Sequence, residues 1–103
     1  YTLIGLPPSR DDVESFAADP SPARYAMLVE AGLASPQFGE RWSRMWLDLV
    51  RYVDQTPDYL TSAERAWLYR DWIVEAFNAD RRYDEFVRLQ LAADLLEGVA
   101  PED

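Results

Sequence analysis

Apolar residues recur every three or four positions over much of the chain, which is the spacing of one face of an α-helix. The longest such pattern runs from Gln37 to about Val53 and comprises Phe38, Trp42, Met45, Trp46, Leu49, Val50 and Val53. We therefore expect the longest helix here. The stripe expected to face the core consists of Trp42, Trp46, Leu49 and Val53.

Serine and proline residues mark the expected helix starts in the first third of the chain. Ser9 opens a capping-box pattern before a helix expected over residues 10–18. Ser21 as N-cap, with proline at the first helical position, starts a second helix that ends near Gly32 or Leu33. The Ser35-Pro36 pair repeats this device at the start of the longest helix.

Two further helices are expected in the second half. Thr61 begins a second capping-box pattern, and the helix after it should reach about Phe77. Asn78 follows, a residue type that tolerates the left-handed conformation closing many helices. A broad apolar face then predicts a last helix from about Tyr83 to Leu96.

The pattern contains no strand-like alternation of convincing length and no internal repeat. With short connections, it predicts one all-α domain over residues 1–103, a small bundle of four main helices plus a short N-terminal helix, whose neighbours are mostly antiparallel.

The polar side of the longest helix has two interpretations. Residues three or four positions apart form one polar ridge, made of Arg41, Arg44, Asp48, Arg51 and Gln55. In the first interpretation they pair along the surface while the tryptophans fill the core. In the second, the ridge recognises carboxylates, sulfates or sugars, because arginine binds such groups in a bidentate manner.

The segment from Ala66 to Asp80 places charges beside aromatic residues. Arg70 and Asp71 are expected to form partly buried ion pairs with the longest helix, for instance Asp71 with Arg51 or Arg70 with Asp48. Such pairs more often fix helix register than perform chemistry. On the last helix Asp84 and Arg88 have the spacing of a solvated pair, whereas Gln90 and Asp94 interrupt an apolar run and need partners.

Carboxylates supply the candidate catalytic residues, Asp48, Asp54 and Asp71, which would act as acid, base or metal ligands. The candidate binding residues are Arg41, Arg51, Arg70 and Trp67. Trp67, with Tyr59 and nearby arginines, would suit a carbohydrate if its ring is exposed. The loop around Asp58 lacks the acid pattern and glycine of a calcium loop, so no metal site is predicted.

The net charge and the missing residue types argue against several classes of function. A formal charge of −9 repels phosphate backbones and argues against nucleic-acid binding. The absence of cysteine and histidine excludes thiolate nucleophiles, histidine base chemistry and haem attachment within this segment. No apolar run is long enough to span a membrane, and the start without methionine suggests a piece of a longer protein.

Ordered phrases carry a resemblance across nearly the whole chain: LIGLPPSRDDVESFAADPSPARYAMLVEAGLASPQFGERW, WLDLVRYVD and WLYRDWIVEAFNADRRYDEFVRLQLAADLL. They resemble the planctomycete cytochrome-associated domain family, a domain of unknown function (1549). The matching positions include Gly39, Trp42, Trp46, Asp48, Arg51, Tyr69, Arg70, Asp71, Asn78, Phe86 and Gln90. Met45, where the family commonly has histidine, and the segment Gln55 to Glu64 depart from the pattern, so a family site using them would be lost here.

The resemblance implies a large exported protein, periplasmic or extracellular, in which any haem belongs to a neighbouring domain. It implies no activity. The leading hypothesis is thus a non-catalytic helical scaffold or interaction module whose partners are other domains of the parent chain. The alternatives are part of a carboxylate and arginine enzyme or metal site acting on polysaccharide, and a carbohydrate or anion binding module.

Overall fold

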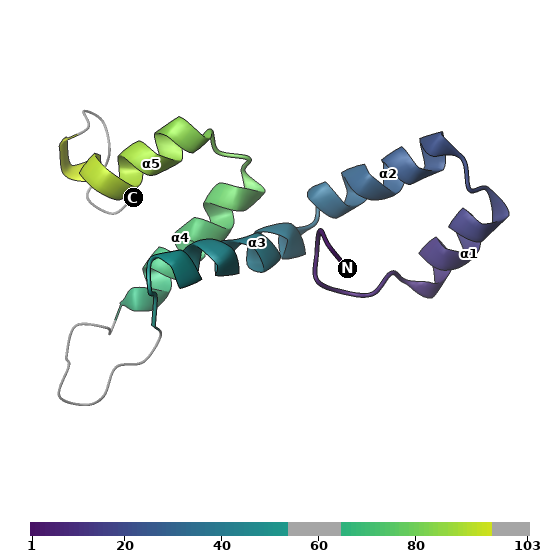
Figure 1. The fold of residues 1–103 in the computed structure, drawn as a ribbon, viewed down its shortest axis with the longest axis horizontal. Coiled ribbons are helices and arrows are strands. Elements are labelled where there is room, and N and C mark those ends of the chain that lie inside the picture. The colour runs from purple at the N-terminus through teal and green to yellow at the C-terminus, as the bar shows by residue number, and fades with distance from the viewer. Residues whose placement is uncertain (54–64, 96–103) are drawn as a thin grey trace.

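A computed structural model describes residues 1–53 and 65–95, and all regular structure in these ranges is helical (Figure 1). The elements are α1 (Arg10–Ala18), α2 (Pro22–Leu33), α3 (Pro36–Leu49), α4 (Ala66–Asn78), α5 (Tyr83–Ala92) and a 3₁₀ turn, η2 (Ala93–Leu95). The predicted all-α class is confirmed. Within these ranges, every helix is too short or too polar to serve as a membrane span.

The first two helix starts form as predicted. Ser9 Oγ accepts the backbone N–H of Asp12 at 3.1 Å and also lies 2.6 Å from its carboxylate. Ser21 Oγ likewise accepts the backbone N–H of Arg24 at 3.2 Å. At the third start the expectation was wrong in part, because the Ser35 hydroxyl makes no cap hydrogen bond and contacts the Gln37 side chain instead.

The ends of α3 and α4 share one closing motif, which corrects two predictions. Arg51 adopts φ 60 and Asp80 adopts φ 48, both left-handed. The next amide in each case bonds five residues back, Tyr52 N–H to Leu47 O at 2.9 Å and Arg81 N–H to Ala76 O at 3.0 Å. These are Schellman motifs.

The motifs correct two predictions. The longest helix, α3, ends at Leu49 rather than at Val53. The left-handed residue that closes α4 is Asp80 rather than Asn78. The predicted start of α4 at Thr61 lies outside the described residues.

α3 and α4 pack antiparallel, with the start of α3 beside the end of α4. Gly39 makes this close approach possible, since a Cβ on it would lie 2.5 Å from the Val74 carbonyl oxygen. One turn later Ser43 is only 2% exposed. Small residues on the inner face of α3 therefore bring the two backbones together.

The core lies where α3, α4 and α5 meet. Ile73, Ala76 and Phe86 are buried there, and partly buried residues surround them: Trp46, Leu47, Tyr69, Trp72, Phe77 and Val87. Phe86 stacks on Trp72 at 5.4 Å between ring centroids and meets Trp46 edge-on at 4.8 Å. Such aromatic pairs stabilise beyond their buried area.

The predicted core stripe of α3 was wrong at its C-terminal end. Trp42 and Trp46 are half-buried, but Leu49 is 70% exposed and Val53 is 55% exposed. The close contact at Gly39 and Ser43 sets which side of α3 faces α4, and the C-terminal part of the stripe lies outside that contact.

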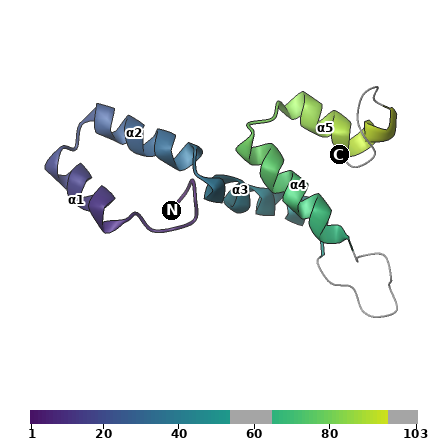
Figure 2. The ribbon, with the colours of Figure 1, turned by 180° about the vertical axis from the view of Figure 1, so that it is seen from behind.

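The helix contacts support the bundle in part. α1 and α2 form an antiparallel hairpin, which we call the N-terminal arm (residues 10–33), and it extends away from α3, α4 and α5 (Figures 1 and 2). No described residue of the arm is buried. The radius of gyration is 18.0 Å, compared with roughly 13 Å for a compact domain of this length.

Candidate functional site

A groove of about 410 Å³ runs between α3 and α4 and contains three of the charged residues that the sequence analysis emphasised, Arg44, Arg70 and Asp71. Its lining residues are Glu40, Ser43, Arg44, Leu47, Arg70, Asp71, Val74 and Glu75. Antiparallel packing brings Glu40 and Arg44 of α3 to the same groove as Arg70, Asp71 and Glu75 of α4. Two arginines and three carboxylates therefore border one groove.

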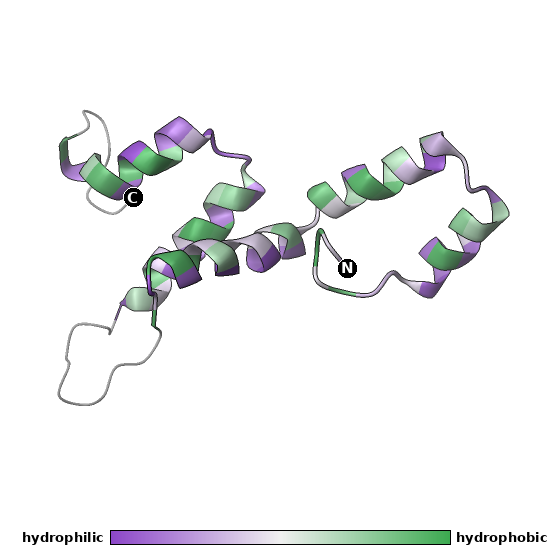
Figure 3. Cartoon of the chain, viewed as in Figure 1, coloured by the Kyte–Doolittle hydropathy of each residue, from purple (hydrophilic) through white to green (hydrophobic). Residues whose placement is uncertain are grey.

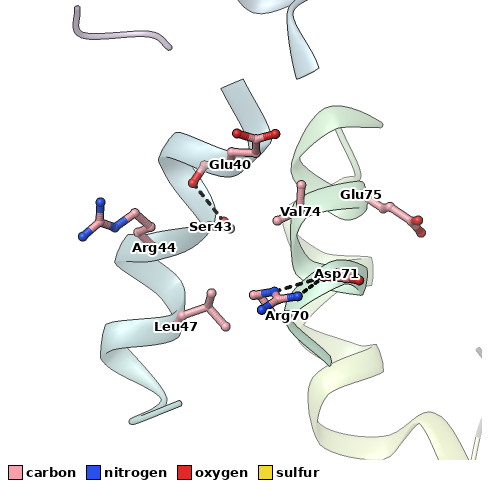
Figure 4. A pocket seen from close by; sticks show the side chains of 8 residues that line it. All are labelled: Glu40, Ser43, Arg44, Leu47, Arg70, Asp71, Val74 and Glu75. Atoms are coloured by element: carbon pink, nitrogen blue, oxygen red, sulfur yellow. Dashed lines mark hydrogen bonds and ion pairs between the residues drawn. The ribbon is translucent and has the colours of Figure 1, made fainter. Parts of the chain in front are cut away.

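The charged groups of the groove do not converge on one point. Figure 4 shows Arg44 directed away from α4 and Glu75 directed away from α3, while Leu47 and Val74 face the space between the helices. The buried hydroxyl of Ser43 is satisfied within its own helix, since it donates to the Glu40 carbonyl oxygen at 3.3 Å. The groove thus has an apolar interior and charged edges, which is the arrangement of a helix packing interface.

Arg70 and Asp71, two of the predicted site residues, pair with each other. Arg70 Nε and Nη2 each lie 3.0 Å from Asp71 Oδ1 (Figure 4). Both side chains are about half exposed, so this pair contributes little to stability. The predicted pairing of Asp71 with Arg51 and of Arg70 with Asp48 is replaced by this contact between sequence neighbours.

The other two candidate catalytic residues, Asp48 and Asp54, have different outcomes. Asp48 is exposed on α3 and does not line it. Asp54 lies outside the described residues, as does Tyr59. Within residues 1–53 and 65–95, no group of three histidine, cysteine, aspartate or glutamate side chains could hold a metal ion. The enzyme hypothesis therefore stays a prediction, and among the described residues Asp71 is the candidate catalytic carboxylate that lines the groove.

The other candidate binding residues lie at separate places. The Arg41 side chain lies beside Gly5 of the N-terminal segment, with Cδ 3.1 Å from where a Cβ would be. Arg51 lies in the turn that closes α3. Trp67, near the start of α4, is 49% exposed. Its ring is thus available for stacking on a sugar, and carbohydrate binding at Trp67 also stays a prediction.

Sequence reasoning missed a hydrogen-bond relay that joins three helices. Trp46 Nε1 on α3 donates to Tyr69 Oη on α4 at 3.2 Å, and this hydroxyl donates to Gln90 Oε1 on α5 at 2.6 Å. Gln90 was predicted to need a partner, and its partner is this tyrosine. The sequence contained one signal for this contact, because Gln90 is a polar residue within the apolar run of the last helix.

The other charge pairs lie at the surface. Arg88 Nη2 lies 3.8 Å from Asp84 Oδ2, which confirms the predicted pair, and Arg82 Nε lies 3.1 Å from Asp84 Oδ1. Asp94, the second polar residue in the apolar run, is exposed in η2. None of these side chains lines the α3–α4 groove.

The fold and the groove define a small helical domain whose prominent polar and aromatic residues connect its helices. A family model described as protein of unknown function DUF1549 (PSCyt2) matches residues 1–103, and the chain belongs to this family. No curated protein and no solved structure matches the chain.

Proposed function

We propose that the chain is a non-catalytic helical interaction module that packs its exposed apolar faces against other domains of a longer parent protein. The observation that carries this proposal is the N-terminal arm, two helices in which no described residue is buried. Helices in soluble proteins are stabilised mainly by burial of an apolar face rather than by intrinsic propensity. The arm therefore needs a surface that the described part of the chain does not provide.

Large apolar side chains are available for such a contact. Tyr25, Met27 and Leu33 on the arm are each more than 40% exposed. Leu91 and Leu95, one turn apart near the C-terminal end of the described chain, are about 80% exposed. Figure 3 shows apolar residues, coloured green, on both α2 and α5. Exposed large apolar side chains of this kind are available for contact with a partner.

The total exposed surface supports the same proposal. The chain exposes 8533 Å², whereas a compact monomer of this size exposes roughly 5,900 Å². The difference, on the order of 2,600 Å², exceeds what one partner contributes to a protein interface of standard size. Surfaces that are covered in the parent protein would account for part of this excess.

Two buried donors lack an acceptor in the described part of the chain. Arg24 Nε on α2 and Trp42 Nε1 on α3 are inaccessible to solvent and have no acceptor within residues 1–53 and 65–95. A buried donor without a partner costs about 1–3 kcal/mol.

The family resemblance supports the setting of the module. In this proposal the parent protein is exported, to the periplasm or beyond, and any haem belongs to another of its domains. Sequence phrases of the family coincide here with packing residues such as Gly39, Tyr69 and Asn78, which favours a structural role over a catalytic one.

Substitution of Met27 tests the proposal. Met27 is 61% exposed, so Met27→Glu should change the free energy of unfolding of the isolated chain by less than about 0.5 kcal/mol. In the full parent protein the same change should clearly lower the melting temperature, because a charge would enter an apolar interface. Met27→Leu is the matched control and should leave both unchanged. Equal effects of Met27→Glu in the two settings would count against the proposal.

A further inference from the structure

A second cavity, which we call the aromatic groove, lies away from the charged α3–α4 groove and has a different character. It has a volume of about 410 Å³ and is lined by Phe38, Trp46, Ala76, Phe77, Asp80, Arg81, Tyr83 and Phe86. The start of α3, the end of α4 and the start of α5 thus contribute to one site. This volume falls within the range of pockets that bind small molecules.

Aromatic rings form most of the lining. Phe86 is 6% exposed and meets Trp46 at 4.8 Å and Phe77 at 6.0 Å between ring centroids, so these three rings form one packed cluster. Phe38 and the exposed Tyr83 add two further rings from α3 and α5. The faces of aromatic rings carry partial negative charge and attract cations that come within about 6 Å.

The charge available at the edge of the groove is negative. The guanidinium group of Arg81 already has partners. Its Nη1 lies 2.7 Å from Glu85 Oε1, and its carbon lies 5.9 Å from the centre of the Trp72 ring. The carboxylate of Asp80 has no hydrogen-bond or ion-pair partner within residues 1–53 and 65–95. The left-handed turn that closes α4 holds Asp80 at this edge.

We propose that the aromatic groove binds a small organic ammonium ion with an apolar body. The rings would contact the apolar body and the positive charge, and Asp80 would pair with the ammonium group. A net charge of −9 adds long-range attraction for cations and repels anions. Neutral sugars fit less well, since the lining offers few hydrogen-bonding side chains besides Asp80, Arg81 and Tyr83.

Nuclear magnetic resonance titration tests this site with 2-phenylethylammonium, compared with the neutral, nearly isosteric 2-phenylethanol at the same ionic strength. The ammonium compound should shift the Trp46 indole N–H and the amides around Arg81 and Phe86. It should bind roughly fivefold more tightly than the alcohol, as expected for one exposed cation–π contact and one exposed ion pair.

Two variants that each remove one negative charge test whether the preference for the ammonium compound arises at Asp80. Asp80→Asn keeps a residue type that tolerates the left-handed turn. It removes the ion pair and leaves the cation–π contact, so it should lower the preference for the ammonium compound from about fivefold to roughly twofold. Asp48→Asn removes an exposed carboxylate that does not line the groove, and it should leave the preference unchanged. The proposal is overturned by equal binding of the two compounds, by equal effects of the two variants, or by absence of saturable shifts at these residues.

Discussion

The side chain of Asn78, the last residue of α4, bonds to the backbone of α3. Its Oδ1 accepts the Gly39 N–H at 2.8 Å, and its Nδ2 donates to the Pro36 carbonyl oxygen at 3.1 Å. One amide therefore provides both an acceptor and a donor to the first turn of another helix. This contact also depends on Gly39 having no side chain, because a Cβ there would lie 2.6 Å from the Asn78 amide. The two residues fix α3 against α4.

Removal of the Asn78 amide should destabilise the chain. Asn78→Ala leaves two backbone groups of α3 without their partners and should lower the free energy of unfolding by about 1–3 kcal/mol. Asn78→Asp should lose less, since it keeps an acceptor and adds a negative charge near the start of α3. Urea denaturation of both variants measures this. A loss in Asn78→Asp equal to that in Asn78→Ala would show that the acceptor contact with Gly39 does not matter.

Alanine at Gly39 should be unfavourable although alanine is the better helix former. The new Cβ would lie 2.5 Å from the Val74 carbonyl oxygen, so α3 and α4 would have to separate. Alanine gains about 1 kcal/mol over glycine in helix propensity, but the clash costs more. We therefore expect Gly39→Ala to lower the free energy of unfolding by about 1–3 kcal/mol. Gly32→Ala is the control within another helix. Its Cβ would meet only the flexible end of Leu3 at 3.0 Å, so thermal denaturation should show a much smaller change.

Loss of the Tyr69 hydroxyl should break the relay between the three helices. Tyr69→Phe leaves Trp46 Nε1 and Gln90 Oε1 without the partner they share, which should cost about 1–2 kcal/mol. Tyr25→Phe, at a ring that is 63% exposed, is the control and should be neutral. A double-mutant cycle of Tyr69→Phe with Gln90→Leu should give a non-zero coupling energy. Additive effects would show that the 2.6 Å contact contributes nothing.

Glycine at position 51 should stabilise the chain. Arg51 adopts φ 60, and the left-handed conformation costs a non-glycine residue roughly 1–2 kcal/mol. Glycine avoids this cost, but its greater freedom in the unfolded chain offsets part of the gain. Arg51→Gly should therefore raise the free energy of unfolding by about 1 kcal/mol. Arg44→Gly, in the interior of α3, should instead lower it. A loss of stability in Arg51→Gly would mean that the arginine side chain outweighs the turn.

Local signals predicted the helices well because their causes are local. The bounds of α1 and α2 follow from Ser9, Ser21 and the proline after it, and the structure reproduces them. The faces of the helices were harder to predict. Leu49 belongs to a regular apolar stripe and is nevertheless exposed, because the close contact at Gly39 decides which side of α3 meets α4.

The candidate site shows the same difference between local signals and contacts between helices. Charge spacing along α4 drew attention to Arg70 and Asp71, and both line the α3–α4 groove. Spacing could not show that they pair with each other, nor that Asn78 bonds to a residue 39 positions earlier. Such contacts depend on the approach of two helices, which only the folded arrangement determines.

The central claim is that the N-terminal arm docks on another part of the parent protein. Hydrogen–deuterium exchange of the arm, measured in the isolated chain and in the full parent protein, tests it most directly. Amides of α2 should exchange rapidly in the isolated chain and at least about a hundredfold more slowly in the parent, since docking adds to the cost of local opening. Amides at the α3–α4 contact around Gly39 are the internal reference and should be protected in both. Equal exchange of the arm in the two proteins would contradict the claim.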